Sequence, residues 1–274
     1  MIRYPMPECF SKRYPTADAC QVAVANHRWL ARLGTALRLP RLLAVGKRRI
    51  DFEYIHGRHA APQDLLSLAI HLGDVHGSAY VTELHRARLD RPHETGTGHR
   101  LPDFLTPRVD SVRRCLRAGN VPDPMLDADE AVRLLREAAP RPAAFYKDVN
   151  PRNVLLADQG PVTVDVDEVT LAPFGYDLAK LFVTIAMTHG TLPTATITAA
   201  LAAYNAAVNG HQDGLGSVTR TELMTWAEIH HVLTCGYLGR GGYQHGWHRH
   251  RPLHPPPQPT GRSPHHSNRD TSWR

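Results

Sequence analysis

The 274-residue sequence contains no apolar run of about 18 residues, the length that a membrane-spanning helix needs. No C-x-x-C pair occurs, and the four cysteines lie far apart, which indicates free thiols in a reduced compartment. Residues 1–20 contain charges and prolines in place of the apolar centre of a signal peptide. These absences predict a cytoplasmic protein that does not span a membrane.

No cluster of lysine and arginine alternates with aromatic residues, although the formal net charge is +6 and the sequence pI is about 9.3. The basic residues are spread along the chain, and this pattern does not favour a nucleic-acid-binding surface. A mildly basic surface suits an anionic nucleotide equally well. A nucleic-acid-binding protein that uses its basic C-terminal segment therefore ranks last among the functions considered.

Two short segments carry most of the chemical information that is present. Residues 146–156 (YKDVNPRNVLL) place Asp148 and Asn153 in a D-x-x-x-x-N pattern before an apolar strand, and residues 162–168 (VTVDVDE) form an apolar strand that ends in acids. Phosphoryl transfer needs a carboxylate to accept the proton of the attacking hydroxyl, and hard oxygen ligands to hold Mg²⁺ on the nucleotide phosphates. Asp148, Asn153 and Asp165 supply these groups in the order found in kinases.

Each motif alone has an ordinary explanation, because an Asp in a loop or at a strand end commonly bonds its own backbone. In this order, however, the chain resembles the aminoglycoside phosphotransferase and choline kinase-like family, within the protein-kinase-like fold. That family reads H-G-D-x-x-x-x-N, then I-D-[WF]-[DE], then Y-D-L-A, which is matched here by residues 176–179. The spacing to Asp177 selects Asp165, and not Asp167, as the metal ligand. The resemblance implies that Asp148 is the catalytic base, that Asn153 and Asp165 bind Mg²⁺, and that Asp177 braces the catalytic loop.

The resemblance also implies where ATP binds. Lys12 occupies the place of the family lysine that pairs with the α- and β-phosphates. Residues 53–57 (EYIHG) match the hinge between two lobes, so the backbones of Glu53 and Ile55 are expected to contact adenine. Without the other motifs, Lys12 would be a solvated strand lysine, and residues 53–57 would be an edge strand followed by a turn.

Three features that the family leads us to expect are missing. No glycine precedes Gly34, so residues 1–33 lack the glycine-rich loop whose backbone cradles nucleotide phosphates. Residues 21–26 (QVAVAN) contain no acid to pair with Lys12. The usual His and Gly before the catalytic Asp are replaced by Tyr146 and Lys147. We therefore expect either a reduced N-terminal lobe or a chain that begins late relative to its relatives.

The predicted fold class is α+β: a two-lobed protein-kinase-like fold with a small, reduced or truncated N-terminal β-lobe and a larger, mainly helical C-terminal lobe. We place the N-lobe at 1–56 and the C-lobe, with the catalytic loop and metal site, at 57–244. Residues 245–274 are rich in His, Pro and Arg and have few aliphatic residues, so they are predicted to be a disordered tail. Residues 90–102 are predicted to be a loop, since they are rich in Gly, Pro and His.

The sequence thus predicts a phosphotransferase that uses ATP and Mg²⁺ to phosphorylate a hydroxyl of a small molecule. The alternative is a pseudoenzyme, a kinase-like interaction module that binds nucleotide poorly. The catalytic groups favour the enzyme, whereas the missing glycine loop and helix acid favour the pseudoenzyme. The acceptor and the oligomeric state stay open, although no dense acidic run of the kind that antibiotic acceptors need follows Asp177.

Overall fold

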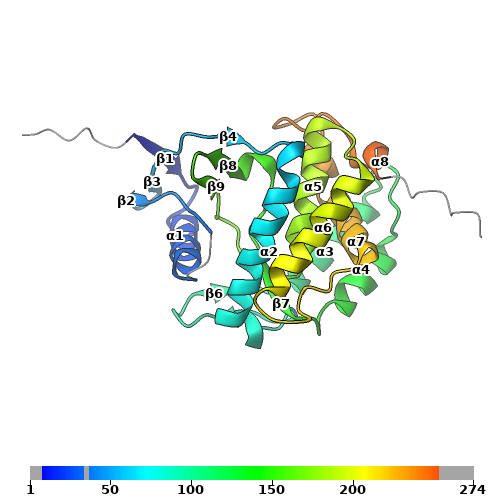
Figure 1. Ribbon diagram of the computed structural model, residues 1–274, viewed down its shortest axis with the longest axis horizontal. Helices are drawn as coiled ribbons and strands as arrows, with labels where there is room; N and C mark the ends of the chain where they lie inside the picture. The colour runs from blue at the N-terminus through cyan, green and yellow to red at the C-terminus, as the bar shows by residue number, and fades with distance from the viewer. Residues whose placement is uncertain (1–7, 34–36, 253–274) are drawn as a thin grey trace, which may run out of the picture.

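The computed structural model describes residues 8–33 and 37–252. Its strand-rich part and its helical part lie side by side along the longest axis of the molecule (Figure 1). The larger helices are α1 (Ala17–Arg32), α2 (Leu65–Thr82), α3 (Leu105–Arg117), α4 (Ala128–Glu137), α5 (Tyr176–His189), α6 (Thr194–Asn209) and α7 (Arg220–Thr234). Shorter helical turns are η1 (Pro62–Asp64), η2 (Leu84–Arg86), η3 (Pro151–Asn153), η4 (Cys235–Tyr237) and α8 (Trp247–His250).

The N-terminal part is a three-stranded antiparallel sheet covered by α1. The strands β1 (Cys9–Arg13), β2 (Leu42–Val45) and β3 (Arg49–Glu53) lie in the order β1-β3-β2, and Lys12 is opposite Ile50. Thr16 begins α1 because its hydroxyl accepts a hydrogen bond from the Ala19 N–H at 3.0 Å, as a helix N-cap does. A small separate core of buried residues joins the helix to the sheet: Tyr14, Cys20, Ala23, Val24, Ile50 and Phe52.

The helical part forms the main core around α5. Residues Tyr176–Met187 of this helix are all buried, so it is surrounded by protein on every side. Helices α2 and α6 pack tightly against each other because Gly73 of α2 has no side chain. A Cβ atom at Gly73 would lie 2.5 Å from the carbonyl oxygen of Tyr204. Helices α2 and α7 pack against α5, which carries Asp177 in its first turn.

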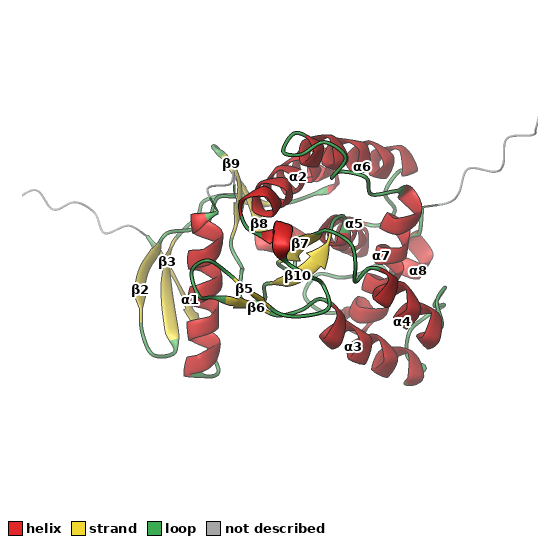
Figure 2. Cartoon of the chain, turned by 90° about the horizontal axis from the view of Figure 1, so that it is seen from below, coloured by secondary structure: helices red, strands yellow, loops and turns green. Residues whose placement is uncertain are grey.

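Short strands connect the two parts and carry the candidate site. β4 (Arg58–His59), β8 (Val154–Ala157) and β9 (Gly160–Thr163) form one antiparallel sheet, and β7 (Ala143–Tyr146) pairs with β10 (Thr170–Pro173). β7 leads into the segment with Asp148, and β9 leads into the segment with Asp165. The segment 90–102, predicted to be a loop, contains the hairpin β5 (His93–Glu94) and β6 (Arg100–Leu101), which lies beside α1 (Figure 2).

The predicted start of the disordered tail, residue 245, needs correction. Trp247 in α8 is 1% exposed, and its indole N–H donates to the Glu228 carboxylate of α7 at 2.8 Å. The Arg251 guanidinium donates to the same carboxylate from two nitrogens, both at 2.9 Å. The composition of residues 245–252 did not predict this order, because the order depends on one buried tryptophan and on one ion pair to the distant helix α7. Residues 253–274 of the expected tail lie outside the described residues.

The fold class predicted from the sequence is confirmed: the protein is α+β, with a small strand-rich part and a larger helical part. No helix within residues 8–33 and 37–252 has the length and apolar character required to cross a membrane.

Candidate active site

The segment after β7 has a strained and firmly braced backbone. Asp148 has φ 53°, in the left-handed region that few residues other than glycine, asparagine and aspartate adopt. The carboxylate of Asp177, at the start of α5, accepts the N–H groups of Lys147 at 3.3 Å and Val149 at 3.2 Å, one on each side of Asp148. Asp177 is fully buried, and burial raises its pKa to about 6 although Lys147 opposes the shift. These two bonds fix the direction in which the Asp148 side chain leaves the backbone.

The Asp148 carboxylate is itself held from two sides. Its Oδ1 accepts the Tyr146 hydroxyl at 2.7 Å and pairs with the Lys180 ammonium at 3.1 Å. Burial acts to raise the pKa of Asp148, but the Lys180 charge and the Tyr146 hydrogen bond outweigh it and hold the pKa below its ordinary value. The group is therefore an oriented carboxylate, ionised at neutral pH, that keeps 38% of its side chain exposed.

Lys147, noted in the sequence only as a replacement for the family's glycine, is part of the candidate site. It stands where relatives have glycine, is 2% exposed, and donates its ammonium to the Thr163 hydroxyl at 3.1 Å. Burial lowers the pKa of Lys147 to about 8, against the opposing charges of Asp177 and Asp148. The structure shows that its long side chain fills the space beneath the loop and ties it to β9.

The second acidic segment meets the first through the backbone and through Lys12. The Val164 N–H donates to the Asn153 carbonyl at 3.0 Å, which aligns the segment after β9 with η3. The Asn153 amide donates to the Asp148 carbonyl at 3.0 Å. The Lys12 ammonium lies 3.0 Å from Asp165, so a residue of the N-terminal sheet reaches across to the helical part.

Lys12 also lies 2.6 Å from Asp167, a residue to which sequence reasoning gave no role. Burial acts to lower the pKa of Lys12, but Asp167 and Asp165 outweigh it and raise the pKa. Asn26, in the stretch 21–26 of α1 that contains no acid, is buried. Its amide donates to the backbone carbonyls of Val166 at 3.0 Å and Asp167 at 2.8 Å.

A cavity of about 440 Å³ lies between the two parts of the molecule. Five of the six predicted site residues line it: Lys12, Glu53, Ile55, Asn153 and Asp165. The sixth, Asp148, adjoins it through the hydrogen bond from Asn153. The Glu53 carboxylate turns away to Arg41 at 3.0 Å, and the Glu53 N–H bonds the Arg41 carbonyl. Glu53 and Ile55 line this cavity at and just after the end of β3.

The side of Asp148 toward the C-terminal segment is cationic and aromatic. The Arg152 guanidinium stacks 4.4 Å from the centre of the Tyr243 ring. Gly241 comes so close that a Cβ atom there would lie 2.7 Å from Arg152 Nη1, and its φ of +53° also favours glycine. No Asp or Glu occurs from residue 229 to residue 252, and Glu228 is already paired with Arg251. This side therefore offers no free carboxylate to a cationic ligand among the described residues.

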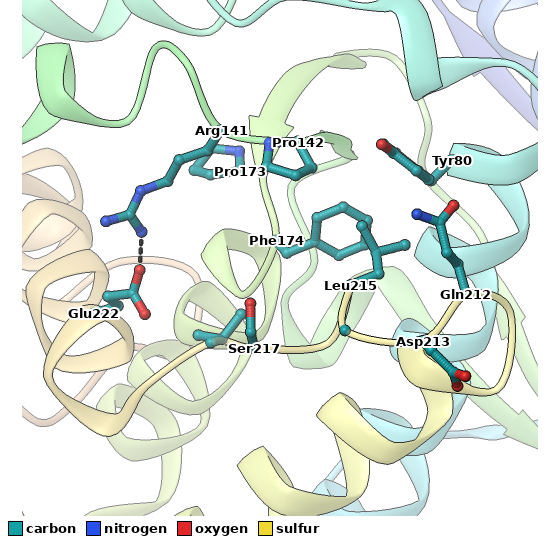
Figure 3. A pocket seen from close by; sticks show the side chains of 12 residues that line it. Tyr80, Arg141, Pro142, Pro173, Phe174, Gln212, Asp213, Leu215, Ser217 and Glu222 are labelled. Atoms are coloured by element: carbon teal, nitrogen blue, oxygen red, sulfur yellow. Dashed lines mark hydrogen bonds and ion pairs between the residues drawn. The ribbon is translucent and has the colours of Figure 1, made fainter.

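A second cavity, of about 380 Å³, lies at the far end of β10, between α2 and the loop before α7 (Figure 3). Arg141 and Glu222 at its edge pair with each other, as the dashed line in Figure 3 marks. Neither Asp148 nor Asp165 lines it, so it has no part in the arrangement described above.

The residues at the first cavity fit a magnesium ion. Asn153 and Asp165 offer an amide oxygen and a carboxylate, the hard oxygen ligands that Mg²⁺ prefers, and the Asn153 nitrogen is directed to Asp148. No group of three or more His, Cys, Asp or Glu side chains in residues 8–33 and 37–252 could hold a metal by itself. Two protein ligands suit Mg²⁺ that is bound together with nucleotide phosphates and water.

The architecture matches solved structures of protein-kinase-like fold. The macrolide 2'-phosphotransferase MphH from Brachybacterium faecium superposes with a TM-score of 0.56, at 14% identity, over 84% of this chain and 76% of that one. The aminoglycoside phosphotransferase APH(3'')-Id from Streptomyces rimosus, solved with ADP and streptomycin, gives a TM-score of 0.54 at 16% identity, over 82% and 86%. Because the sequence identities are this low, the superpositions establish the fold alone. That fold is the protein-kinase-like fold.

The family follows from the sequence match. The profile of the phosphotransferase enzyme family matches residues 8–231, which include both acidic segments and the Y-D-L-A motif. The protein therefore belongs to the phosphotransferase enzyme family, and the predicted resemblance is confirmed. No curated protein matches the chain significantly.

Proposed function

We propose that this protein is an ATP-dependent phosphotransferase that moves the γ-phosphate to a hydroxyl of a small molecule. Membership of the phosphotransferase enzyme family supports phosphoryl transfer in general. The observation that supports the catalytic form most directly is the orientation of Asp148. Its carboxylate is fixed by Tyr146 and Lys180, and its backbone is fixed by Asp177, beside a cavity of nucleotide size.

In this proposal the residues divide the work as follows. Asp148 orients the acceptor hydroxyl and takes its proton, the hydroxyl oxygen forms the new bond to the γ-phosphorus, and ADP leaves with the electrons of the broken P–O bond. Lys12 contacts the α- and β-phosphates, and the backbones of Glu53 and Ile55 hold adenine. Asn153 and Asp165 hold Mg²⁺, which neutralises charge on the phosphate oxygens when it is bound. The ionised state of Asp148 at neutral pH supports its role as base.

The acceptor we propose is neutral or anionic and carries few positive charges. The Lys180 ammonium is paired with Asp148 at 3.1 Å, so the further positive charge on this side is that of Arg152, which stacks on Tyr243. A cationic acceptor would be repelled by this guanidinium, and residues 229–252 supply no carboxylate to oppose the repulsion. The aminoglycoside acceptor of the Streptomyces rimosus structure is therefore not proposed for this chain.

One observation favours the alternative, a kinase-like module with poor nucleotide binding. Residues 8–33 contain no glycine, so the N-terminal sheet lacks the loop that donates backbone N–H groups to phosphates. We accordingly expect weak binding of Mg-ATP, with a Kd on the order of 1 mM, or about 4 kcal/mol.

Calorimetry with Mg-ATP, followed by a turnover assay against a panel of hydroxyl compounds, tests the proposal. Millimolar binding with ADP release in the presence of one acceptor supports the enzyme. If no binding is detected at Mg-ATP concentrations up to about 10-fold above the expected Kd, and no acceptor causes ADP release, the proposed enzyme is refuted. The interaction module then remains as the alternative. Micromolar binding would support the nucleotide site but refute the argument from the missing glycine loop.

A further inference from the structure

Lys12 is held without the helix acid that kinase lysines use. In an active kinase site the phosphate-binding lysine pairs with a glutamate of the following helix, and this pair keeps the lysine directed at the nucleotide. The structure supplies two other carboxylates. Asp165 lies 3.0 Å from the Lys12 ammonium, and Asp167 lies 2.6 Å from it.

Asp167 is the better fixed of the two. Its Oδ1 accepts the Tyr14 hydroxyl at 3.0 Å, while its Oδ2 faces Lys12. Its backbone carbonyl accepts the Asn26 amide at 2.8 Å, and its N–H donates to Asp165 Oδ1 at 3.2 Å. Asp167 therefore keeps its direction through bonds that do not involve Lys12.

Asp165 is the carboxylate that the proposed function assigns to Mg²⁺. A carboxylate that binds a divalent cation has less to offer an ammonium, since both compete for the same oxygen lone pairs. Lys12 needs a second partner that stays in place when metal and nucleotide are bound, and Asp167 is placed to be that partner.

We propose that Asp167 replaces the missing helix acid and positions Lys12 on the nucleotide phosphates. This inference rests on the proposed function. Asp167 is a positioning residue, because it acts through Lys12 and does not touch the reacting atoms. In this proposal the acid that holds Lys12 comes from the segment after β9, which also carries Asp165. Helix α1 contributes through Asn26, which holds the backbone of that segment.

Asn26 completes the connection between α1 and Lys12. It occupies the helix where the acid is missing, and its two donor bonds hold the carbonyls of Val166 and Asp167. Its carbonyl oxygen is in turn bonded to the His99 ring at 2.8 Å, from the β5–β6 hairpin beside α1 (Figure 2). Helix α1 is therefore still connected to Lys12, because Asn26 holds the backbone of Asp167 and Asp167 holds the Lys12 ammonium.

A double-mutant cycle between Asp167→Asn and Lys12→Ala tests the inference, since it isolates an effect transmitted through one partner. The first readout is affinity for ADP in EDTA, measured by calorimetry, which needs neither metal nor turnover. The second is kcat/KM for ATP. Asp51→Asn is the matched control. Asp51 lies in the same N-terminal sheet as Lys12, but its carboxylate pairs with Arg49 and not with Lys12.

We expect Asp167→Asn to lower kcat/KM for ATP by roughly tenfold to a hundredfold and to weaken ADP binding by about fivefold to tenfold, because Lys12 loses a charged partner and turns to Asp165. In the Lys12→Ala background the same substitution should change either quantity less than about threefold. Asp167→Glu, which keeps the carboxylate, should recover part of the loss, and Asp51→Asn should leave both readouts unchanged.

Three results would overturn the inference. A loss that persists in the Lys12→Ala background would mean that Asp167 acts on the metal or on the fold. If Asp167→Asn changed only the Mg²⁺ concentration required for activity and left ADP affinity in EDTA unchanged, Asp167 would be a metal ligand. Unaltered ADP binding and kcat/KM in Asp167→Asn would remove its role while leaving the proposed function intact. If the unsubstituted protein binds no ADP, the proposed function fails, and this inference fails with it.

Discussion

Replacement of Asp148 by asparagine is the sharpest perturbation of the proposed chemistry. The substitution keeps the size and shape of the side chain and removes only its charge and proton affinity. Asparagine also tolerates the left-handed backbone at φ 53°, whereas alanine would add about 1–2 kcal/mol of strain there. The two backbone bonds from residues 147 and 149 to Asp177 do not depend on the side chain that changes. The loop should therefore keep its conformation.

The expected magnitude follows from the proton transfer that is lost. A positioned general base contributes about 10² to 10⁴ in rate, which corresponds to about 3–5 kcal/mol of activation free energy. The Asp148 carboxylate is preorganised by Tyr146 and Lys180, so we expect kcat to fall at least about 100-fold. Nucleotide affinity should change less than about threefold, since Asp148 does not line the cavity between the two parts. A fall of kcat with binding preserved is the signature of an interaction made in the transition state.

The assay is ADP release with an acceptor found by the panel, together with calorimetry of ADP binding. Asp158→Asn serves as the control, because Asp158 is an exposed acid in the turn between β8 and β9. The pH profile supplies a second check. Lys180 and Tyr146 hold the pKa of Asp148 below its ordinary value, so activity should be lost on acidification only below the usual aspartate range. A kcat within about threefold of the unsubstituted protein would refute the assignment of Asp148 as base.

Three further outcomes are expected. Asp165→Asn should abolish the Mg²⁺ dependence of ADP binding measured by calorimetry, because it removes the charged ligand, and an unchanged dependence would refute that role. Trp247→Ala should lower the free energy of unfolding in urea by about 3–5 kcal/mol, since it empties a buried site and removes one hydrogen bond to the Glu228 carboxylate. A loss below about 1 kcal/mol would mean that α8 is not part of the core. In the acceptor panel, hydroxyl compounds that carry several amines should be phosphorylated at least about tenfold more slowly than neutral or anionic hydroxyl compounds, and Arg152→Ala should narrow that gap. Equal rates would contradict the charge argument.

The sequence was sufficient for the fold class and the family. Asp148, Asn153, Asp165 and Asp177 form an ordered pattern of the residue types that phosphoryl transfer uses, and this order can be read along the chain without its fold. Helix starts depend on local signals of the same kind, as at Thr16, where a side-chain hydroxyl caps the first turn of α1.

Spacing along the chain could not reveal what Lys147 and Asp167 do. A lysine beside the catalytic aspartate reads as exposed, yet the structure buries Lys147 against Thr163 of β9. Asp167 seemed dispensable because the spacing selected Asp165, yet it makes the shorter contact with Lys12. Both outcomes depend on which strands and helices lie against one another.

Order in residues 245–252 has the same origin. Their composition is that of a solvated tail, and it is the burial of Trp247 and the Glu228–Arg251 pair that hold them against α7. Local sequence records which groups can react and where helices begin, because these properties depend on neighbours along the chain. Partners from distant segments decide which charges are paired and which segments are ordered, because desolvation and ion pairing depend on distance in space and not on distance along the chain.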